Sequence, residues 1–232
     1  QIAFSTLGND GDLLLDDELT NETDYEKSWH RWRAFHPALA EKLLEESSSS
    51  GEWIVRIEDF DRQARERGFY PNWGPLAGGL ASQSASFAEA AIERCFENET
   101  TPLDRVFAVI LHDRPNSDEK LKDEWLARAI ESTKEELRCA ALGSLRWQEE
   151  PPGDRAADAI RALLGEIDGP ARNQAIHALG EALSLGKLWP WKLIEAIPFA
   201  KIDDDTLKHF VTSLVRGDQY RGLKIEIGDL HP

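Results

Sequence analysis

Methionine is absent from this 232-residue sequence, cysteine occurs only twice, and no run approaches the roughly 18 apolar residues of a membrane-spanning helix. The first ten residues lack the basic start and apolar stretch of a signal peptide. We therefore expect a cytoplasmic protein with two buried free thiols, Cys95 and Cys139, with one disulfide as the alternative. Because the chain also begins with Gln1, it is expected either to be a piece of a longer product or to lack segments of it.

Positive charge is scarce as well. The 27 Lys and Arg residues face 43 Asp and Glu residues, which gives a net charge of -16. Such a surface repels phosphate groups, which disfavours nucleic-acid and anionic-membrane binding, and it suits a basic protein partner or solubility alone. Residues 1–52 hold twelve acidic and four basic residues, a net charge of -8, so this acidic segment is a candidate contact surface. Its densest acidic run is Asp16, Asp17 and Glu18.

Sequence motifs of catalysis and metal binding are missing too. The six histidines include no pair four residues apart, and neither cysteine has a companion at metal-ligand spacing. The segment "NDGDLLLDDE" (9–18) lacks the glycine and the final glutamate of a calcium loop. The glycine-rich segment 70–84 has no P-loop lysine and predicts a bend. No catalytic residue, cofactor or metal is therefore predicted.

One short motif does resemble an enzyme signature. "RIEDFDR" (56–62) resembles the Arg-Ile-Glu-Asp-Thr-Asp signature of glutamyl-tRNA synthetases, a resemblance that would imply aminoacylation. In that family a His-Ile-Gly-His element precedes the signature, and nothing similar precedes Arg56; Phe60 stands where the family has threonine. Ile57 and Phe60 also share a helical face with Trp53 and Ala64. We interpret the segment as an amphipathic helix that ends at Gly68.

An internal repeat gives the strongest fold signal. "ELRCAALGSL" (136–145) and "QAIHALGEAL" (174–183) share Ala-Leu-Gly at an offset of 37 residues, and each precedes a second helical pattern, at 155–167 and 189–197. Two helices in such a period are typical of an α-solenoid. The chain here resembles HEAT repeats, roughly over 133–216, a resemblance that implies binding along a stacked helical surface.

Other helices are marked by their ends. A helix from about Asp24 is expected to be kinked or split by Pro37, and Ser47–Ser50 predicts a loop. Thr101 and Ser117 are expected N-caps, with Pro102 in the first helical position. An acidic start predicts a last helix over 203–215, and the alternation of Leu223, Ile225 and Ile227 predicts a short strand.

Together these patterns predict an all-α fold, an α-solenoid of antiparallel helix pairs with an irregular acidic N-terminal segment and a short C-terminal strand. The expected domains are an acidic N-terminal segment with one helix (1–50), a helical repeat domain (51–216) and a tail with the strand (217–232).

Tryptophan is abundant, with eight residues, and it is the side chain most enriched at binding hot spots. The best candidate anchors are Trp189 and Trp191, which flank Pro190 at a turn between helices; Trp29 and Trp32 share a helix. We therefore expect a non-catalytic protein-binding module, an acidic adaptor or inhibitor of a basic protein, similar in charge and size to bacterial immunity proteins. The alternatives are a sensing or scaffolding region of a larger protein, and an enzyme or ligand-binding protein with a site assembled from scattered residues.

Overall fold

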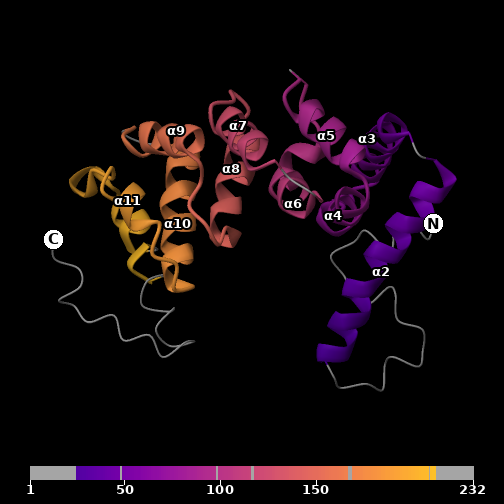
Figure 1. Ribbon diagram of the computed structural model, residues 1–232, viewed down its shortest axis with the longest axis horizontal. Helices are drawn as coiled ribbons and strands as arrows, with labels where there is room; N and C mark the ends of the chain where they lie inside the picture. Colours follow the sequence, from indigo (N-terminus) through magenta and orange to yellow (C-terminus); the bar gives the residue numbers. More distant parts are fainter. Residues whose placement is uncertain are drawn as a thin grey trace. The chain divides into compact units, whose positions relative to one another are not determined.

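The computed structural model describes residues 25–47, 49–97, 99–115, 118–166, 169–208 and 210–212, with the backbone alone for 25–34 and Lys201 (Figure 1). Within these residues every regular element is an α-helix or a short 3₁₀ helix, which confirms the all-α prediction. The expected strand and Asp16, Asp17 and Glu18 lie outside the described residues. The chain forms two compact units, residues 1–117 and 118–232, while the domain boundaries expected at 50 and 216 stay predictions.

The helices of the first unit pack in two rows. Helix α4 packs between α2 and α6, while α3 packs on α5, and α5 also contacts α4 and α6. The 3₁₀ helix η2 leads directly into α6 and contacts α3, α4 and α5. The bounds are α2 (Tyr25–Glu46), α3 (Ser50–Glu66), α4 (Gly74–Gln83), α5 (Ala85–Cys95), η2 (Pro102–Val106) and α6 (Phe107–Asp113).

Helix α2 contains Pro37 but is not split by it. The helix runs from Tyr25 to Glu46, and the carbonyl of Pro37 accepts a hydrogen bond from Gln83 Nε2 at 2.6 Å. This bond joins the middle of α2 to the end of α4. The loop expected at 47–50 ends before Ser50, because α3 already begins at that residue.

Helix α4 corrects the expected bend in the glycine-rich segment. Its glycines lie where neighbouring helices come closest: a Cβ on Gly78 would lie 2.5 Å from Oδ2 of Asp113, and one on Gly79 would lie 3.1 Å from the carbonyl oxygen of His36. Glycine costs a helix about 1 kcal/mol relative to alanine. The packing that it allows against α2 and α6 outweighs this cost, so residues 74–83 of the segment form a mostly buried helix.

In the second unit the helices α7 to α10 each pack on the second helix along the chain as well as on an immediate neighbour. Helix α8 packs on α10 and α7 on α9, with further contacts between α7 and α8 and between α9 and α10 (Figure 1). Helix α11 contacts α9. The bounds are α7 (Glu119–Ile130), α8 (Glu135–Gly143), η3 (Ser144–Trp147), α9 (Asp154–Leu164), α10 (Pro170–Ser184), α11 (Trp191–Ile194) and η4 (Phe199–Lys201).

The two Ala-Leu-Gly segments are parts of α8 and α10, two helices that pack on each other, and each segment precedes another helix. In the structure, equivalent positions of the two helix pairs are 34 residues apart, whereas the Ala-Leu-Gly segments of the sequence are 37 residues apart. Arg138 Nε donates to the carbonyl of Ile130 at 3.1 Å, and Arg172 Nε, 34 residues later, donates to that of Leu164 at 3.5 Å. Ile130 and Leu164 are the last residues of α7 and α9.

Burial follows the same 34-residue spacing. Five pairs of positions on α8–η3 and α10 are buried in both copies: Leu137 and Ala171, Ala141 and Ala175, Leu142 and Ile176, Ser144 and Ala178, Leu145 and Leu179. The shorter spacing differs from the sequence offset by three residues, close to one helical turn. A sequence match displaced by one turn keeps a similar helical face, which explains why both spacings give plausible alignments.

Helix starts agree with the sequence in two of three cases. Thr101 caps η2 through a capping box in which its backbone N–H donates to Asp104 Oδ2 at 3.0 Å. Asp203 accepts the backbone N–H of Thr206 at 2.8 Å, as expected for an acidic start. The expected cap Ser117 is wrong, because α7 is capped by Asp118, which accepts from the N–H of Lys120 at 2.9 Å.

Candidate functional site

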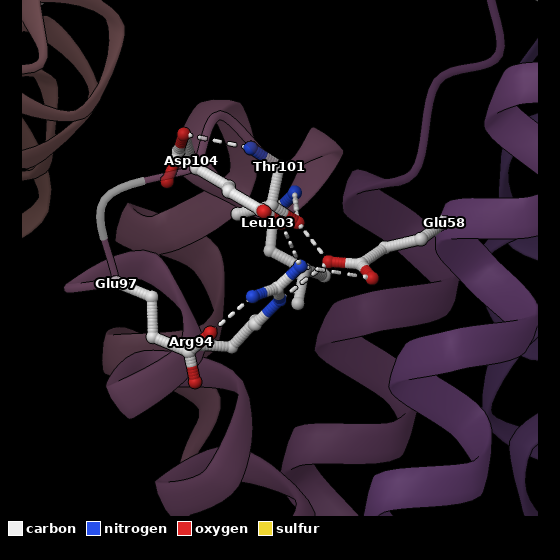
Figure 2. A network of polar contacts seen from close by, with 7 residues as sticks. Glu58, Arg94, Glu97, Thr101, Leu103 and Asp104 are labelled. Atoms are coloured by element: carbon white, nitrogen blue, oxygen red, sulfur yellow. Dashed lines mark hydrogen bonds and ion pairs between the residues drawn. The ribbon is translucent and has the colours of Figure 1, made fainter.

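The synthetase-like segment lies on α3, and its glutamate belongs to a polar network (Figure 2). The carboxylate of Glu58 accepts hydrogen bonds from Arg94 Nε at 2.7 Å and from Thr101 Oγ1 at 2.8 Å. Arg94 also pairs with Glu97 and, at 3.3 Å, with Glu99. The network ties α3 to α5 and to the start of η2.

Arg94 is the cation of this network. Its hydrogen bonds to the carboxylates of Glu58 and Glu97 raise the pKa of Arg94 above its ordinary value, against the opposing effect of burial. The guanidinium, which is protonated across the ordinary pH range in any case, therefore stays positive. It acts as a permanent cation that balances nearby carboxylates, and it is not a proton donor for chemistry.

The two aspartates of the segment also bond neighbouring side chains. Asp61 is buried and accepts from the indole Nε1 of Trp73 at 2.9 Å and from Arg65 Nε at 2.5 Å. Asp59 pairs with Arg62 and accepts from Gln63 Nε2 at 2.6 Å. Each carboxylate of the segment thus has a protein partner, which agrees with its interpretation as a structural helix.

In residues 25–212, apart from the gaps given above, no three His, Cys, Asp or Glu side chains cluster closely enough to hold a metal ion. None of the helices described there combines the length and the apolar character that crossing a membrane requires.

Large apolar side chains are exposed in two neighbouring segments of the second unit. Leu188 is 77% exposed, in the turn after α10. Leu185, at the end of α10, and Trp147, at the end of η3, are each 38% exposed. Exposed apolar residues that gather at one place are candidates for contact with another protein.

The turn that carries Leu188 has a defined shape. Gly186 has φ +82°, its N–H donates to the carbonyl of Leu183 at 2.8 Å, and the N–H of Lys187 donates to the carbonyl of Ala182 at 3.2 Å. This pair of bonds is a Schellman motif, which ends α10 and requires a left-handed residue at the glycine position. Leu188 therefore projects from a closed, hydrogen-bonded turn.

Hydrogen bonds hold the two segments next to each other. Lys187 Nζ donates to the carbonyl of Arg146 at 2.9 Å, and the indole Nε1 of Trp189 donates to the carbonyl of Gln148 at 3.3 Å. We call the apolar residues so brought together the Trp147–Leu188 surface. It consists of Trp147, Leu185, Leu188 and the half-buried Trp189.

Charged groups around this surface are unevenly exposed. Lys187 has a side chain only 8% exposed and lies 3.4 Å from the carboxylate of Glu149, which is 86% exposed. Arg146 stacks over the ring of Trp147 at 4.6 Å and pairs with Glu181 at 3.4 Å. The basic groups next to the apolar residues are thus already paired.

Only some of the tryptophans proposed from the sequence lie at this surface. Trp189 belongs to it, although its indole N–H is used internally, and Trp191 is half-buried at the first position of α11. Trp29 and Trp32 lie on α2, with side chains outside the described residues. Sequence reasoning missed Leu188 and Trp147. A large apolar residue two positions after a helix-ending glycine was the signal for Leu188.

Comparison with known proteins finds no match: no family model fits the sequence, and neither curated proteins nor solved structures are similar to it.

Proposed function

We propose that the chain is a non-catalytic protein-binding module built as an α-solenoid of HEAT-like helix pairs. The packing of α8 on α10 and of α7 on α9, together with the 34-residue recurrence of Arg138 and Arg172, supports this architecture. In a solenoid each repeat contacts only its neighbours, so side chains at the turns stay available to partners.

The Trp147–Leu188 surface carries the proposal. Soluble proteins bury most of their large apolar side chains, and an exposed group of them held in a rigid frame is typical of an interaction site. Tryptophan is also among the residues that contribute most to binding energy. Leu188, at 77% exposure, contributes nothing to the core that would explain its place there.

Charge indicates the class of partner. With a net charge of -16 the protein attracts basic proteins over several ångströms and repels nucleic acids. We therefore propose an acidic adaptor or an inhibitor of the immunity-protein type, in which electrostatic attraction speeds association and apolar contacts slow dissociation.

Affinity capture from the native cell extract tests this function. The tagged full chain is used as bait at about 0.1 M and about 1 M salt, between which the Debye length falls from about 10 Å to about 3 Å. We expect one basic protein in stoichiometric amount at low salt and much less of it at high salt. Recovery of no protein, or of an acidic protein that ignores salt, would contradict the proposal.

A further inference from the structure

We infer that the Trp147–Leu188 surface docks a segment of the partner in which large apolar side chains are flanked by lysine or arginine. This inference rests on the proposed function and specifies where, and by which chemistry, the partner binds.

The apolar part of the surface is preorganised. The Schellman motif at Gly186 fixes the turn, and the bonds from Lys187 Nζ and Trp189 Nε1 fix that turn against residues 146–148. A binding surface that is already ordered loses little conformational entropy when a partner docks. The apolar area that Leu188 and Trp147 still expose can therefore contribute to affinity when a partner covers it.

The exposed charge at the edge next to Trp147 is negative. Glu149 is 86% exposed and Glu150, the next residue, is exposed as well. Glu149 pairs with Lys187, whose side chain is only 8% exposed, and Arg146, which is 40% exposed, pairs with Glu181, so the two carboxylates are the most exposed charges beside Trp147. Lys192 on α11 is also exposed. We therefore restrict the carboxylate edge of the surface to Glu149 and Glu150, which closely follow Trp147 in the chain.

Charge complementarity then selects the occupant. A second copy of this chain also carries a net charge of -16, and a nucleic acid carries phosphates, so charge repulsion disfavours both. A segment with basic residues beside its apolar anchors pairs with Glu149 and Glu150 while the anchors contact Leu188 and Trp147.

Binding of three synthetic peptides of equal length to the full chain tests the inference. In the first peptide leucine residues alternate with lysine residues. The second has glutamate in place of each lysine, and the third has serine in place of each leucine. Fluorescence anisotropy of the labelled peptides is measured at about 0.1 M salt. We expect the leucine–lysine peptide to bind at least about tenfold more tightly than either of the others, since each of those lacks one of the two contacts.

Two matched variants locate the site. Leu188→Glu removes the main anchor but adds a negative charge, so docking at this surface predicts at least about tenfold weaker binding, whereas charge attraction alone predicts stronger binding. Val55→Glu adds the same charge at a residue of α3 that is 63% exposed, and it should leave the affinity within about twofold. Because both positions are exposed, we expect unchanged circular dichroism.

Glu149→Gln combined with Glu150→Gln should weaken binding of the leucine–lysine peptide and flatten its salt dependence. The inference is overturned if the leucine–glutamate peptide binds equally well, if no peptide binds, or if Leu188→Glu binds like Val55→Glu. Capture of a basic protein that is indifferent to Leu188→Glu would overturn this inference and leave the proposed function standing. Peptide binding at this surface without any protein captured from the extract would support this inference and contradict the proposed function.

Discussion

The indole Nε1 of Trp73 donates a hydrogen bond to Oδ1 of Asp61 at 2.9 Å, and both side chains are buried. The bond connects α3 to the residue directly before α4. Asp61 is the last acidic residue of the synthetase-like segment, so the part of the sequence that most resembles an enzyme helps to fix how two helices are joined. Arg65 supplies the balancing charge at 2.5 Å.

Replacing this aspartate should destabilise the fold. Asp61→Ala leaves the buried indole N–H of Trp73 without its acceptor, which costs about 1–3 kcal/mol. Asp61→Asn keeps an acceptor and should cost less. Urea unfolding followed by circular dichroism measures both. The matched control is Asp59→Ala, whose side chain is 46% exposed and whose pair with Arg62 is worth at most about 0.5 kcal/mol. Equal losses for Asp61→Ala and Asp59→Ala would contradict the role of the Trp73 bond.

Two helical glycines should respond in opposite ways to alanine. A Cβ on Gly78 would lie 2.5 Å from Oδ2 of Asp113 and 2.8 Å from Cγ1 of Val109, so Gly78→Ala must displace these two side chains of α6 and should cost about 1–3 kcal/mol. A Cβ on Gly51, in α3, would meet nothing within 4 Å. Gly51→Ala should therefore be neutral or stabilising by up to about 1 kcal/mol. Thermal unfolding compares the two, and a loss of similar size in both would disprove the close-packing account of α4.

The glycines of α4 also show where sequence reasoning ended. Local propensity favours a bend in the glycine-rich segment, because nothing in a single sequence reveals that α2 and α6 pack against it. Features that depend on only a few neighbouring residues were predicted more successfully. They are the N-cap Thr101 followed by Pro102, the end of α3 near Gly68, which has φ +79°, and the helix start at Asp203. Contacts between helices need the fold itself.

The same contrast holds for the candidate site. The prediction placed Trp189 at a turn between helices, and the turn after α10 is where the Trp147–Leu188 surface lies. Trp147 could not be associated with that turn beforehand, because the hydrogen bonds that join the two segments link residues 41 positions apart. The 37-residue repeat in the sequence correctly identified α8 and α10 as equivalent helices, but it aligned their residues about one helical turn away from the 34-residue spacing of the structure.

The start of α9 offers a test of coupling between neighbouring helices. The carboxylate of Asp123, on α7, accepts the N–H groups of Arg155 at 3.1 Å and Ala156 at 3.0 Å, and so caps α9 from outside. A Cβ on Gly153 would lie 2.4 Å from Cγ of Asp123. Asp123→Ala should cost about 1–2 kcal/mol, as a lost cap does, and Gly153→Ala a similar amount through displacement of the carboxylate.

The double variant distinguishes this account from two independent effects. When Asp123 is already alanine, Gly153→Ala has no carboxylate to displace, so the combined loss should fall short of the sum by at least about 0.5 kcal/mol. Urea unfolding of the unmodified protein, the two single variants and the double variant gives the four free energies that this comparison needs. Additive losses would show that Gly153 and Asp123 act separately.

The reactivity of the two thiols should follow their surroundings. Cys95 is fully buried and should react with iodoacetamide only on unfolding. Cys139 is half-buried, and burial raises its pKa, as does the carboxylate of Glu135, whose oxygen lies 3.7 Å from the sulfur. Since the thiolate is the reactive form, alkylation of Cys139 should be slower at pH 8 than that of an ordinary exposed thiol and should keep rising at higher pH.

Removing the nearby charge tests the cause of this shift. Glu135→Gln takes away a negative charge that opposes ionisation, so the pKa of Cys139 should fall and its alkylation at pH 8 should become faster. Glu124→Gln, an exposed position on α7, removes the same charge elsewhere and should leave the rate unchanged. Mass spectrometry of timed samples follows each cysteine separately. Equal rates in the two variants would mean that burial alone sets the pKa, and faster labelling of Cys95 than of Cys139 would contradict the packing of α5.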